Sequence, residues 1–270
     1  MDGSKEKKYD IKRTAKIALK TLLDSFVVIM LIMCCLFVIF PKTSLEIHEM
    51  LGNNKMQEHN YRVIYARSND IKDLYNLIIF EGYVENCKDE LYYIDEMLTR
   101  NDYSEFCEQM DKASALEIEK KQLTSYSANV NGYLLSRKVI CMYKLGENGL
   151  ESYIYRQTAG GKLSEYSFST YVDLVQADES LTDSQKSEKL SCLMDTMDGI
   201  NGKLSSLLQK RVDSLKTAIT QTDNNKKDVL KYTLMRIYAA RFYVYDVIGD
   251  DELRNENLKL YKEIKAEILN

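Results

Sequence analysis

The sequence is poor in proline, tryptophan and histidine, and the shortage of proline constrains the fold most. The 270 residues include no tryptophan, two histidines and one proline, Pro41. Proline is common in loops and at the edges of sheets, but it disrupts the interior of a helix. Because the 229 residues after Pro41 contain no further proline, the sequence predicts an all-α fold with long helices.

The shortage of histidine restricts the chemistry that the chain could carry out. His48 and His59 each stand beside a glutamate, but neither forms the H-E-x-x-H motif of a zinc site. A Ser-His-Asp or Cys-His system would need one of these two residues. Gly160-Gly161-Lys162 falls short of a phosphate-binding loop, because Leu163 stands where that motif requires Ser or Thr. We therefore expect no enzyme activity, no metal site and no cofactor.

The chain as a whole also lacks an excess of positive charge. Its formal net charge is −4. Residues 1–24 are the exception, with seven Lys or Arg against four Asp or Glu, so the remaining residues are mildly acidic. Binding to nucleic acid requires a basic surface that neutralises phosphates. We therefore expect no nucleic acid partner.

One long apolar run is present from Ser25 to Phe40, and it reads SFVVIMLIMCCLFVIF. Sixteen helical residues span about 24 Å, slightly less than the hydrocarbon core of a bilayer at about 30 Å. A helix that extends from Thr21 to Thr43 would supply the missing length. The run therefore predicts a single transmembrane anchor at residues 25–41, with membrane lipid around residues 21–43.

The positive charges predict the orientation of this anchor. Lys and Arg are concentrated before the run, and only Lys42 and Lys55 follow it within the next twenty residues. Because positive charge is retained on the cytoplasmic side, we expect a cell-membrane protein whose residues 1–24 form a basic cytoplasmic tail. A juxtamembrane helical segment, 42–68, and an extracytoplasmic α-helical domain, 69–270, would follow. A cleaved signal peptide is the alternative, but no A-x-A-like site follows the run.

Four of the six cysteines fall in the domain predicted to be extracytoplasmic: Cys87, Cys107, Cys141 and Cys192. Four cysteines permit three complete disulfide pairings in an oxidising compartment. Their spacings are long and irregular, and no C-x-x-C occurs among them. We therefore favour unpaired buried thiols, and the disulfide pairing stays open.

Helical periodicity is clearest toward the C-terminus. From Asp183 to Ile219, apolar residues advance by threes and fours and form one face of a helix. A Tyr-rich helix is predicted from Lys226 to Ile248, and a last helix follows Gly249. Helix pairs of this length resemble tetratricopeptide-type hairpins in architecture, although no 34-residue signature repeats along the chain. The domain is therefore predicted to be a helical-hairpin array (TPR-like) or a bundle.

The middle of the domain fits two interpretations. Residues 133–145 and 150–157 flank the turn Gly146–Gly149 and fit two helices. The same residues are rich in β-formers and the turn contains an Asn-Gly pair, so a small β-hairpin around 139–156 is the alternative. We favour helices, and the choice between a helical and a β-meander structure for residues 134–176 stays open.

These features favour a non-enzymatic interaction or scaffold protein that acts in a membrane or envelope complex. A membrane anchor raises the local concentration of the domain near other membrane proteins, so we expect a protein partner there. The partner-contact residues that we predict lie on the Tyr-rich helix: Tyr232, Tyr238, Tyr243 and Tyr245. Core packing explains the same residues, because tyrosine fills a core while its hydroxyl stays at the wet edge.

Two other classes of function are weighed against this one. An extracytoplasmic ligand-sensing domain would signal through the anchor to a partner protein, and it predicts a closed pocket between helices. A membrane-anchored hydrolase would have to use His48 or His59, because the sequence supplies no recognisable set of nucleophile, base and metal ligands.

Overall fold

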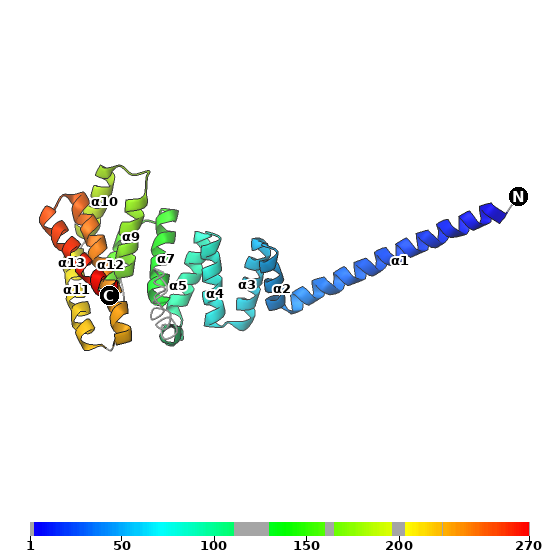
Figure 1. The fold of residues 1–270 in the computed structure, drawn as a ribbon, viewed down its shortest axis with the longest axis horizontal. Coiled ribbons are helices and arrows are strands. Elements are labelled where there is room, and N and C mark those ends of the chain that lie inside the picture. The colour runs from blue at the N-terminus through cyan, green and yellow to red at the C-terminus, as the bar shows by residue number, and fades with distance from the viewer. Residues whose placement is uncertain (1–2, 111–129, 160–164, 196–202, 223, 270) are drawn as a thin grey trace. The chain divides into compact units, whose positions relative to one another are not determined.

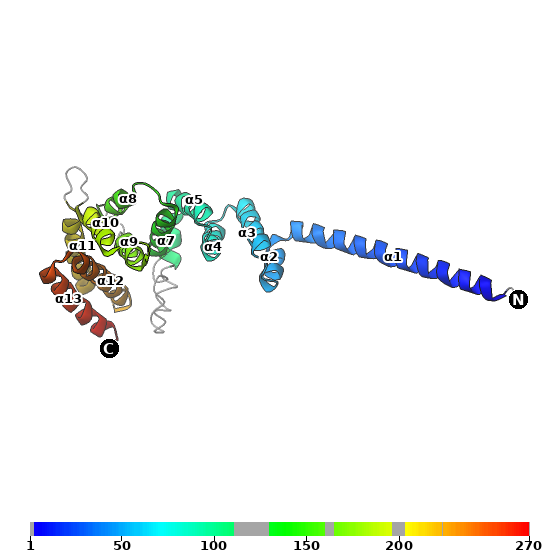
Figure 2. The same ribbon diagram turned by 90° about the horizontal axis from the view of Figure 1, so that it is seen from above.

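The computed structural model describes residues 3–110, 130–159, 165–195, 203–222 and 224–269. Every helix or strand assigned within these residues is an α-helix, which confirms the all-α prediction (Figure 1, Figure 2). The chain divides into two compact units, Met1–Leu77 and Ile78–Asn270.

The helices of the first unit are α1 (Gly3–Ile39), α2 (Pro41–Met50) and α3 (Asn54–Ser68), and α4 (Ile71–Tyr83) carries the boundary between the units. The helices of the second unit are α5 (Cys87–Thr99), α7 (Val130–Leu145), α8 (Leu150–Ala159), α9 (Glu165–Ala177), α10 (Asp183–Asp195), α11 (Leu204–Gln221), α12 (Asn224–Ile248) and α13 (Asp251–Leu269). Residues 103–110 are also helical.

Pro41 separates α1 from α2. It has no backbone N–H to donate, so it fits the first position of a new helix and cannot continue the old one. Phe40 before it has φ −117° and ψ 73°, outside the helical region. The predicted extension of one helix to Thr43 is therefore wrong, because α1 ends at Ile39. On the other side of the apolar run, α1 continues back to Gly3.

The predicted juxtamembrane segment, 42–68, forms a pair of packed helices, α2 and α3. Asn53 begins α3 by accepting a hydrogen bond from the backbone N of Met56 at 3.3 Å. Between the helices, Asn60 Nδ2 donates to Ser44 Oγ at 3.0 Å, and both residues are buried. A buried polar pair of this kind fixes which residues of the two helices face each other, because another alignment would leave each group buried without a hydrogen-bond partner.

The second unit is a succession of helices, each packed on another. α5 packs on α7, α7 on α9 and α9 on α12, and α12 also packs on α10, α11 and α13. The turn between α12 and α13 is closed by hydrogen bonds from Gly249 N and Asp250 N to Tyr245 O. The predicted C-terminal pair of helices, with its Tyr-rich first member, is therefore confirmed.

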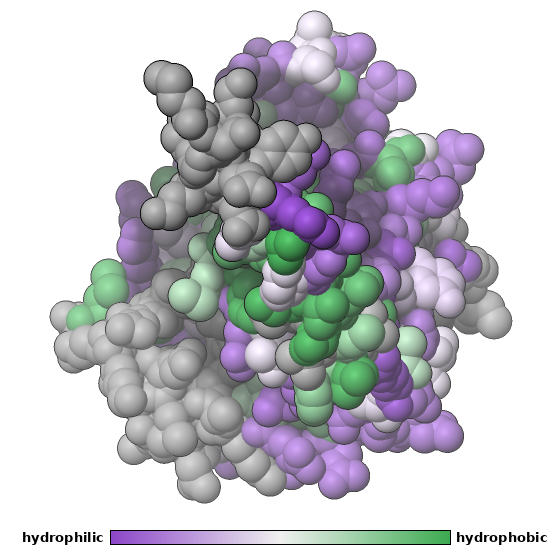
Figure 3. Space-filling view, turned by 90° about the vertical axis from the view of Figure 1, so that its right-hand side faces the viewer, coloured by the Kyte–Doolittle hydropathy of each residue, from purple (hydrophilic) through white to green (hydrophobic). Residues whose placement is uncertain are grey.

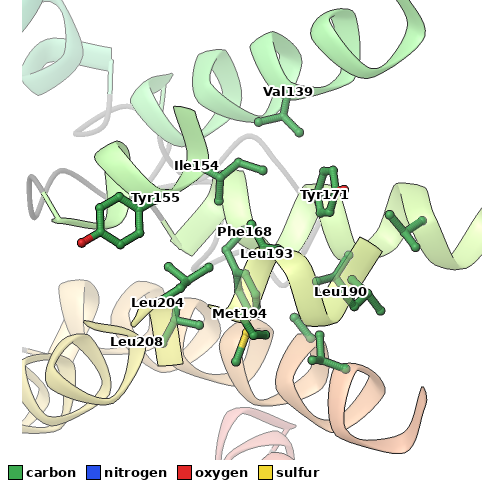
Figure 4. Close-up of a cluster of buried hydrophobic side chains, with 14 of the residues drawn as sticks. Val139, Ile154, Tyr155, Phe168, Tyr171, Leu190, Leu193, Met194, Leu204 and Leu208 are labelled. Atoms are coloured by element: carbon green, nitrogen blue, oxygen red, sulfur yellow. The ribbon is translucent and has the colours of Figure 1, made fainter. Parts of the chain in front are cut away.

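One hydrophobic cluster joins α7, α8, α9, α10, α11 and α12. Figure 4 shows labelled side chains of five of these helices, α7 to α11, around a shared interior. The buried members of the cluster are Leu135, Val139, Leu150, Tyr153, Ile154, Tyr155, Phe168, Tyr171, Val172, Val175, Leu190, Leu193, Met194, Leu204, Leu208, Ala240, Val244 and Tyr245. Burying each large aliphatic or aromatic side chain contributes about 1.5–3 kcal/mol, so this cluster is a main source of stability for the second unit.

The middle of the domain is helical in the described residues. α7 and α8 are joined by a turn in which Gly146 has φ +65° and Gly149 has φ +90°, conformations that favour glycine. The preference for helices is confirmed, and the alternative β-hairpin around 139–156 is wrong. α9 continues the helical structure, so residues 134–176 form no β-meander where the structure describes them.

The predicted helical face from Asp183 to Ile219 is confirmed over α10 and α11. Its glycines at 199 and 202 lie outside the described residues. Leu190, Leu193 and Leu208 from this face are completely buried. The apolar spacing therefore identified the residues that enter the core.

We predict that Leu193→Ala lowers the free energy of unfolding by about 2–5 kcal/mol, the cost of emptying a fully buried leucine site. Leu145→Ala is the matched control, because Leu145 is 43 % exposed, and it should change stability by less than about 0.5 kcal/mol. Denaturant unfolding of the full chain, followed by far-UV circular dichroism, measures both. Equal losses in the two variants would contradict the assigned core.

Candidate functional site

Residues 26–32, within the apolar run of α1, are exposed on every side. Phe26 to Ile32 are seven consecutive residues, and each is between 48 and 61 % exposed. Successive residues of a helix point about 100° apart, so seven of them cover its whole circumference. Figure 3 shows one face of the molecule, on which hydrophobic residues are exposed.

Charged residues interrupt α1 just before the apolar run. Lys20 and Asp24 lie four residues apart, and Ser25 begins the run. Within the described part of the chain, no helix has both the length and the apolar character that crossing a lipid bilayer requires. The predicted transmembrane span therefore has no support from these helices.

The C-terminal end of α1 is bound by α3. Arg67 Nη1 donates to the carbonyl oxygen of Ile39 at 3.4 Å, which places a positive charge at the negative end of the helix dipole. A cavity of about 370 Å³ lies beside this contact. Its lining consists of Ile39, Phe40, Pro41, Lys42, Thr43, Ile64, Arg67, Ser68 and Asp73. The end of the apolar helix is thus attached to the α2–α3 pair.

The four tyrosines predicted to contact a partner differ in exposure. Tyr238 and Tyr245 are buried, at 1 and 8 % exposed, and each belongs to a hydrophobic cluster of the second unit. Tyr232 and Tyr243 are partly exposed. The contact role stays a prediction, and only Tyr232 and Tyr243 of the four are accessible enough for it.

A polar pocket of about 400 Å³ lies at the turn between α7 and α8, within the size range of small-molecule sites. Tyr143 Oη donates to Asp178 Oδ2 at 2.7 Å, and Tyr171 Oη donates to Glu151 Oε1 at 2.7 Å. The two rings meet edge to face, with 6.0 Å between their centroids. The lining consists of Met142, Tyr143, Gly146, Glu147, Asn148, Gly149, Leu150, Glu151, Tyr171, Asp178, Leu181 and Lys189.

The tyrosine hydroxyls of this pocket stay protonated. Burial raises the pKa of Tyr143 and of Tyr171, and the hydrogen bonds to Asp178 and Glu151 raise it further. In return, hydrogen bonds from Ser180 and Tyr143 lower the pKa of Asp178. The charged residues of the lining are Glu147, Glu151, Asp178 and Lys189. Their excess of negative charge suits a cationic ligand.

A buried polar cluster links α5 to α7. Glu90 is completely buried and accepts hydrogen bonds from Arg137 Nε at 2.5 Å and Arg137 Nη2 at 2.6 Å. Cys141 Sγ donates to Glu90 Oε2 at 3.2 Å. Cys87 Sγ, Cys141 Sγ and a carboxylate oxygen of Glu90 all lie within 4.8 Å of one another. Two residues from each helix therefore meet at one buried point.

The surroundings of this cluster favour a charged ion pair beside a protonated Cys141 thiol. The hydrogen bonds to Glu90 raise the pKa of Arg137, so its guanidinium stays charged. Burial raises the pKa of the Cys141 thiol, and the negative charge of Glu90 adds to this effect. Gly82 leaves the room that the pair occupies, because a Cβ there would lie 2.9 Å from Glu90 Oε1 and 3.1 Å from Arg137 Nη2.

Sequence reasoning missed this cluster, although two spacings carried a signal for it. Cys87 and Glu90 are three residues apart on α5, and Arg137 and Cys141 are four apart on α7, so each pair shares one helix face. The sequence did not show that these two faces meet. The histidines considered for catalysis, His48 in α2 and His59 in α3, belong to the first unit.

All six cysteines are free thiols in the structure, which agrees with the preference for unpaired thiols. Their burial differs from the expectation in part. Cys87 and Cys141 are buried, Cys107 is intermediate and Cys192 is exposed.

Comparison of the chain with protein-family models, curated proteins and solved structures finds no match. The function is therefore inferred from the residues and their geometry.

We predict that Glu90→Gln lowers the free energy of unfolding by about 3–5 kcal/mol, because it leaves the charge of Arg137 without its buried partner. The matched control is Glu85→Gln, which removes an exposed ion pair with Lys144 and should cost less than about 1 kcal/mol. Denaturant unfolding of the full chain measures both. A small loss for Glu90→Gln, similar to that of the control, would contradict the ion-pair geometry.

We also predict that Tyr143→Phe raises the pKa of Asp178 toward its ordinary value, because one of its hydrogen-bond donors is lost. A carboxyl group whose pKa is lowered in the folded state stabilises the fold at pH values above its ordinary pKa. This contribution is lost as the pH falls through the lowered pKa. The variant should therefore lose less stability in acid than the parent does.

Carboxyl NMR of the full chain across pH measures this pKa, and Asp178→Asn assigns the resonance. Tyr83→Phe is the control, because Tyr83 is 73 % exposed and does not line the pocket. An unchanged Asp178 pKa in Tyr143→Phe would contradict the hydrogen bond.

Proposed function

We propose that this protein is a membrane-attached interaction or scaffold protein without enzyme activity, in which α1 enters the lipid and the helical second unit contacts a protein partner. The observation that carries this proposal is the exposure of Phe26–Ile32 around the whole circumference of α1. Exposing apolar surface to water costs about 25 cal/mol per Å². A packed helix covers one stripe of its neighbour, whereas lipid tails cover every side.

The apolar run is short for a complete crossing, and its flanks supply the difference. The helical part from Ser25 to Ile39 spans about 22 Å, against a hydrocarbon core of about 30 Å. Lys20 and Asp24 have the four-residue spacing of a helix ion pair, and the stem of Lys20 reaches toward the head groups. Local thinning of the bilayer accommodates a short span at modest cost. These terms support a single-pass anchor.

The distribution of charge supports one orientation of that anchor. Arg13, Lys16 and Lys20 are exposed on α1 before the run, within a segment, residues 1–24, that carries seven basic residues. Basic residues are retained on the cytoplasmic side and attract its anionic lipids. The proposed orientation therefore has the N-terminus in the cytoplasm and the second unit outside the cell membrane.

The partner-binding part of the proposal rests on α12. Tyr232 and Tyr243 are partly exposed on a helix whose other tyrosines, Tyr238 and Tyr245, are buried. Tyrosine offers a large, stiff contact area with a polar tip, which is why it is enriched at interfaces. Attachment to a membrane makes even weak contacts with another membrane protein effective.

We predict that the full chain floats with phosphatidylcholine–phosphatidylglycerol vesicles in a density gradient and that Val28→Lys/Leu31→Lys does not. Each lysine near the centre of an inserted helix costs about 2.5–3.5 kcal/mol. Met50→Lys/Leu51→Lys is the matched control, because these residues are 88 and 71 % exposed in the same unit but lie outside α1. The control should float like the parent. Failure of the parent to float, or equal flotation of both variants, would sink the proposal.

Orientation is measured in the same system by thiol labelling of intact cells. Asn148→Cys places a thiol in the exposed α7–α8 turn of a chain whose Cys34, Cys35, Cys107 and Cys192 are replaced by alanine. A membrane-impermeant reagent should label this chain from outside, and should not label the parent that lacks the new cysteine. Labelling that requires lysis would reverse the orientation.

Ligand sensing is the second function, and the α7–α8 pocket favours it. The aromatic walls and excess of carboxylates suit a ligand with an ammonium or guanidinium group. A sensor requires that a small cation raise the thermal stability of the parent, and that Asp178→Asn abolish this rise while vesicle binding is unchanged. An interaction protein requires no such response.

A further inference from the structure

Two thiols and a carboxylate meet in the interior of the second unit, and the proposed function does not use them. Glu90 and Cys141 are completely buried, and Cys87 is 7 % exposed. The two sulfur atoms and a carboxylate oxygen of Glu90 lie within 4.8 Å of one another. The three residues come from two helices that pack together. Thiolate and carboxylate are both ligands of zinc in proteins.

We propose that Cys87, Glu90 and Cys141 bind a thiophilic divalent cation of the zinc class. Zinc lies about 2.3 Å from sulfur and about 2.1 Å from oxygen, so a tetrahedral site separates the two kinds of ligand by about 3.6 Å. Cys141 Sγ and Glu90 Oε2 are already 3.2 Å apart. All three ligand atoms lie within 4.8 Å of one another, so side-chain adjustment toward these separations would admit the ion.

The balance of charge allows a zinc ion to replace the thiol protons of this buried cluster. Before binding, the charge of the Glu90 carboxylate is balanced by that of Arg137. One Zn²⁺ replaces one proton from each thiol, so two positive charges enter and two leave with the protons. The net charge of the cluster does not change, and the cost of burying an uncompensated charge does not arise.

Neighbouring groups hold the ligands in place for this role. Arg137 donates hydrogen bonds to both oxygens of Glu90 and so orients the carboxylate, as hydrogen-bond donors do for carboxylates that ligate metals. Cys87 is the first residue of α5, so its sulfur lies near the positive end of the helix dipole, where a negatively charged metal ligand is stabilised. Gly82 keeps space beside Glu90 that a side chain would fill.

The bound ion would fasten α5 to α7. The described contacts between these helices also include ion pairs of Lys138 with Asp95 and, from the turn before α5, of Lys144 with Glu85. These pairs are more exposed than Glu90–Arg137 and are therefore screened by water and salt. Three protein ligands leave a fourth position for water or a small anion. The metal would stabilise the packing of α5 on α7 in proportion to its free concentration.

The test is a zinc titration of the full chain in detergent micelles, with thiols reduced and a chromophoric chelator as competitor. We expect one ion per chain and release of about two protons per ion, because both thiols must ionise. Cobalt in place of zinc should give a thiolate-to-cobalt charge-transfer band. Binding should weaken as the pH falls.

Three variants make the result specific to this site. Cys87→Ser should weaken binding by more than about 100-fold, since the loss of even an outer partner of a metal ligand costs about 10- to 100-fold. It leaves the Cys141–Glu90 hydrogen bond in place, so the fold is retained, and circular dichroism verifies this. Cys87→Ser/Cys141→Ser should abolish the cobalt band. Cys107→Ser/Cys192→Ser, which removes two thiols elsewhere, should bind zinc like the parent.

Several outcomes would overturn the inference. They are the absence of competition with the chelator, equal affinity in the parent and Cys87→Ser, and loss of binding in the Cys107→Ser/Cys192→Ser control. Formation of a Cys87–Cys141 disulfide, seen as the loss of two hydrogens by mass, with no zinc uptake by the reduced chain, would also overturn it. None of these outcomes bears on attachment to the membrane, which the Val28→Lys/Leu31→Lys variant tests separately.

Discussion

A fold made of helices satisfies its backbone hydrogen bonds within each helix, so side chains alone decide which helices meet. Apolar packing supplies most of the stability in the second unit but specifies partners weakly, because many apolar faces fit one another. Buried polar pairs are more selective, since a wrong partner leaves a donor or acceptor unsatisfied. Glu90 with Arg137 joins α5 to α7, and Tyr166 with Thr233 joins α9 to α12 at 3.0 Å. The order in which helices pack in this unit depends on such pairs.

The sequence predicted the helices well because their signals are local. Proline content and apolar spacing identified α10 to α13 and predicted helical structure in residues 42–68, and Pro41 marked a boundary that the predicted extension to Thr43 overlooked. The α7–α8 region was ambiguous because β-branched and aromatic residues fit either period, and burial of Val139, Ile154 and Tyr155 among helices decided it. The polar sites could not be predicted. They join residues such as Cys87 and Cys141, 54 positions apart, and no local pattern encodes that pairing.

The tyrosines of α12 show how one residue type serves two purposes. Tyr238 and Tyr245 fill the interior, while Tyr232 and Tyr243 on the same helix are partly exposed. The sequence did not distinguish these four tyrosines. A helix that packs against several neighbours has no single solvent-exposed face for periodicity to reveal. The proposed contact surface therefore depends on position around α12 rather than on the abundance of tyrosine. In residues 26–32 of α1, by contrast, every position around the helix is exposed. The proposed contact with lipid therefore depends on the apolar composition of this segment and not on the position of a residue around the helix.

Glu90 also raises the question of why a charged residue lies in the interior at all. A buried ion pair is weak evidence for stability, because apolar residues of similar volume often pack as well or better. Specificity accounts for Glu90 and Arg137 but not for two thiols beside them. Cys141 fills the third hydrogen-bonding position of the carboxylate, and serine would donate there at least as well. Cys87 makes no hydrogen bond to Glu90 among those described, yet its sulfur lies in the same 4.8 Å cluster. A second sulfur at that place adds little to a polar contact and much to a metal site, which is the physical ground for preferring cation binding over packing.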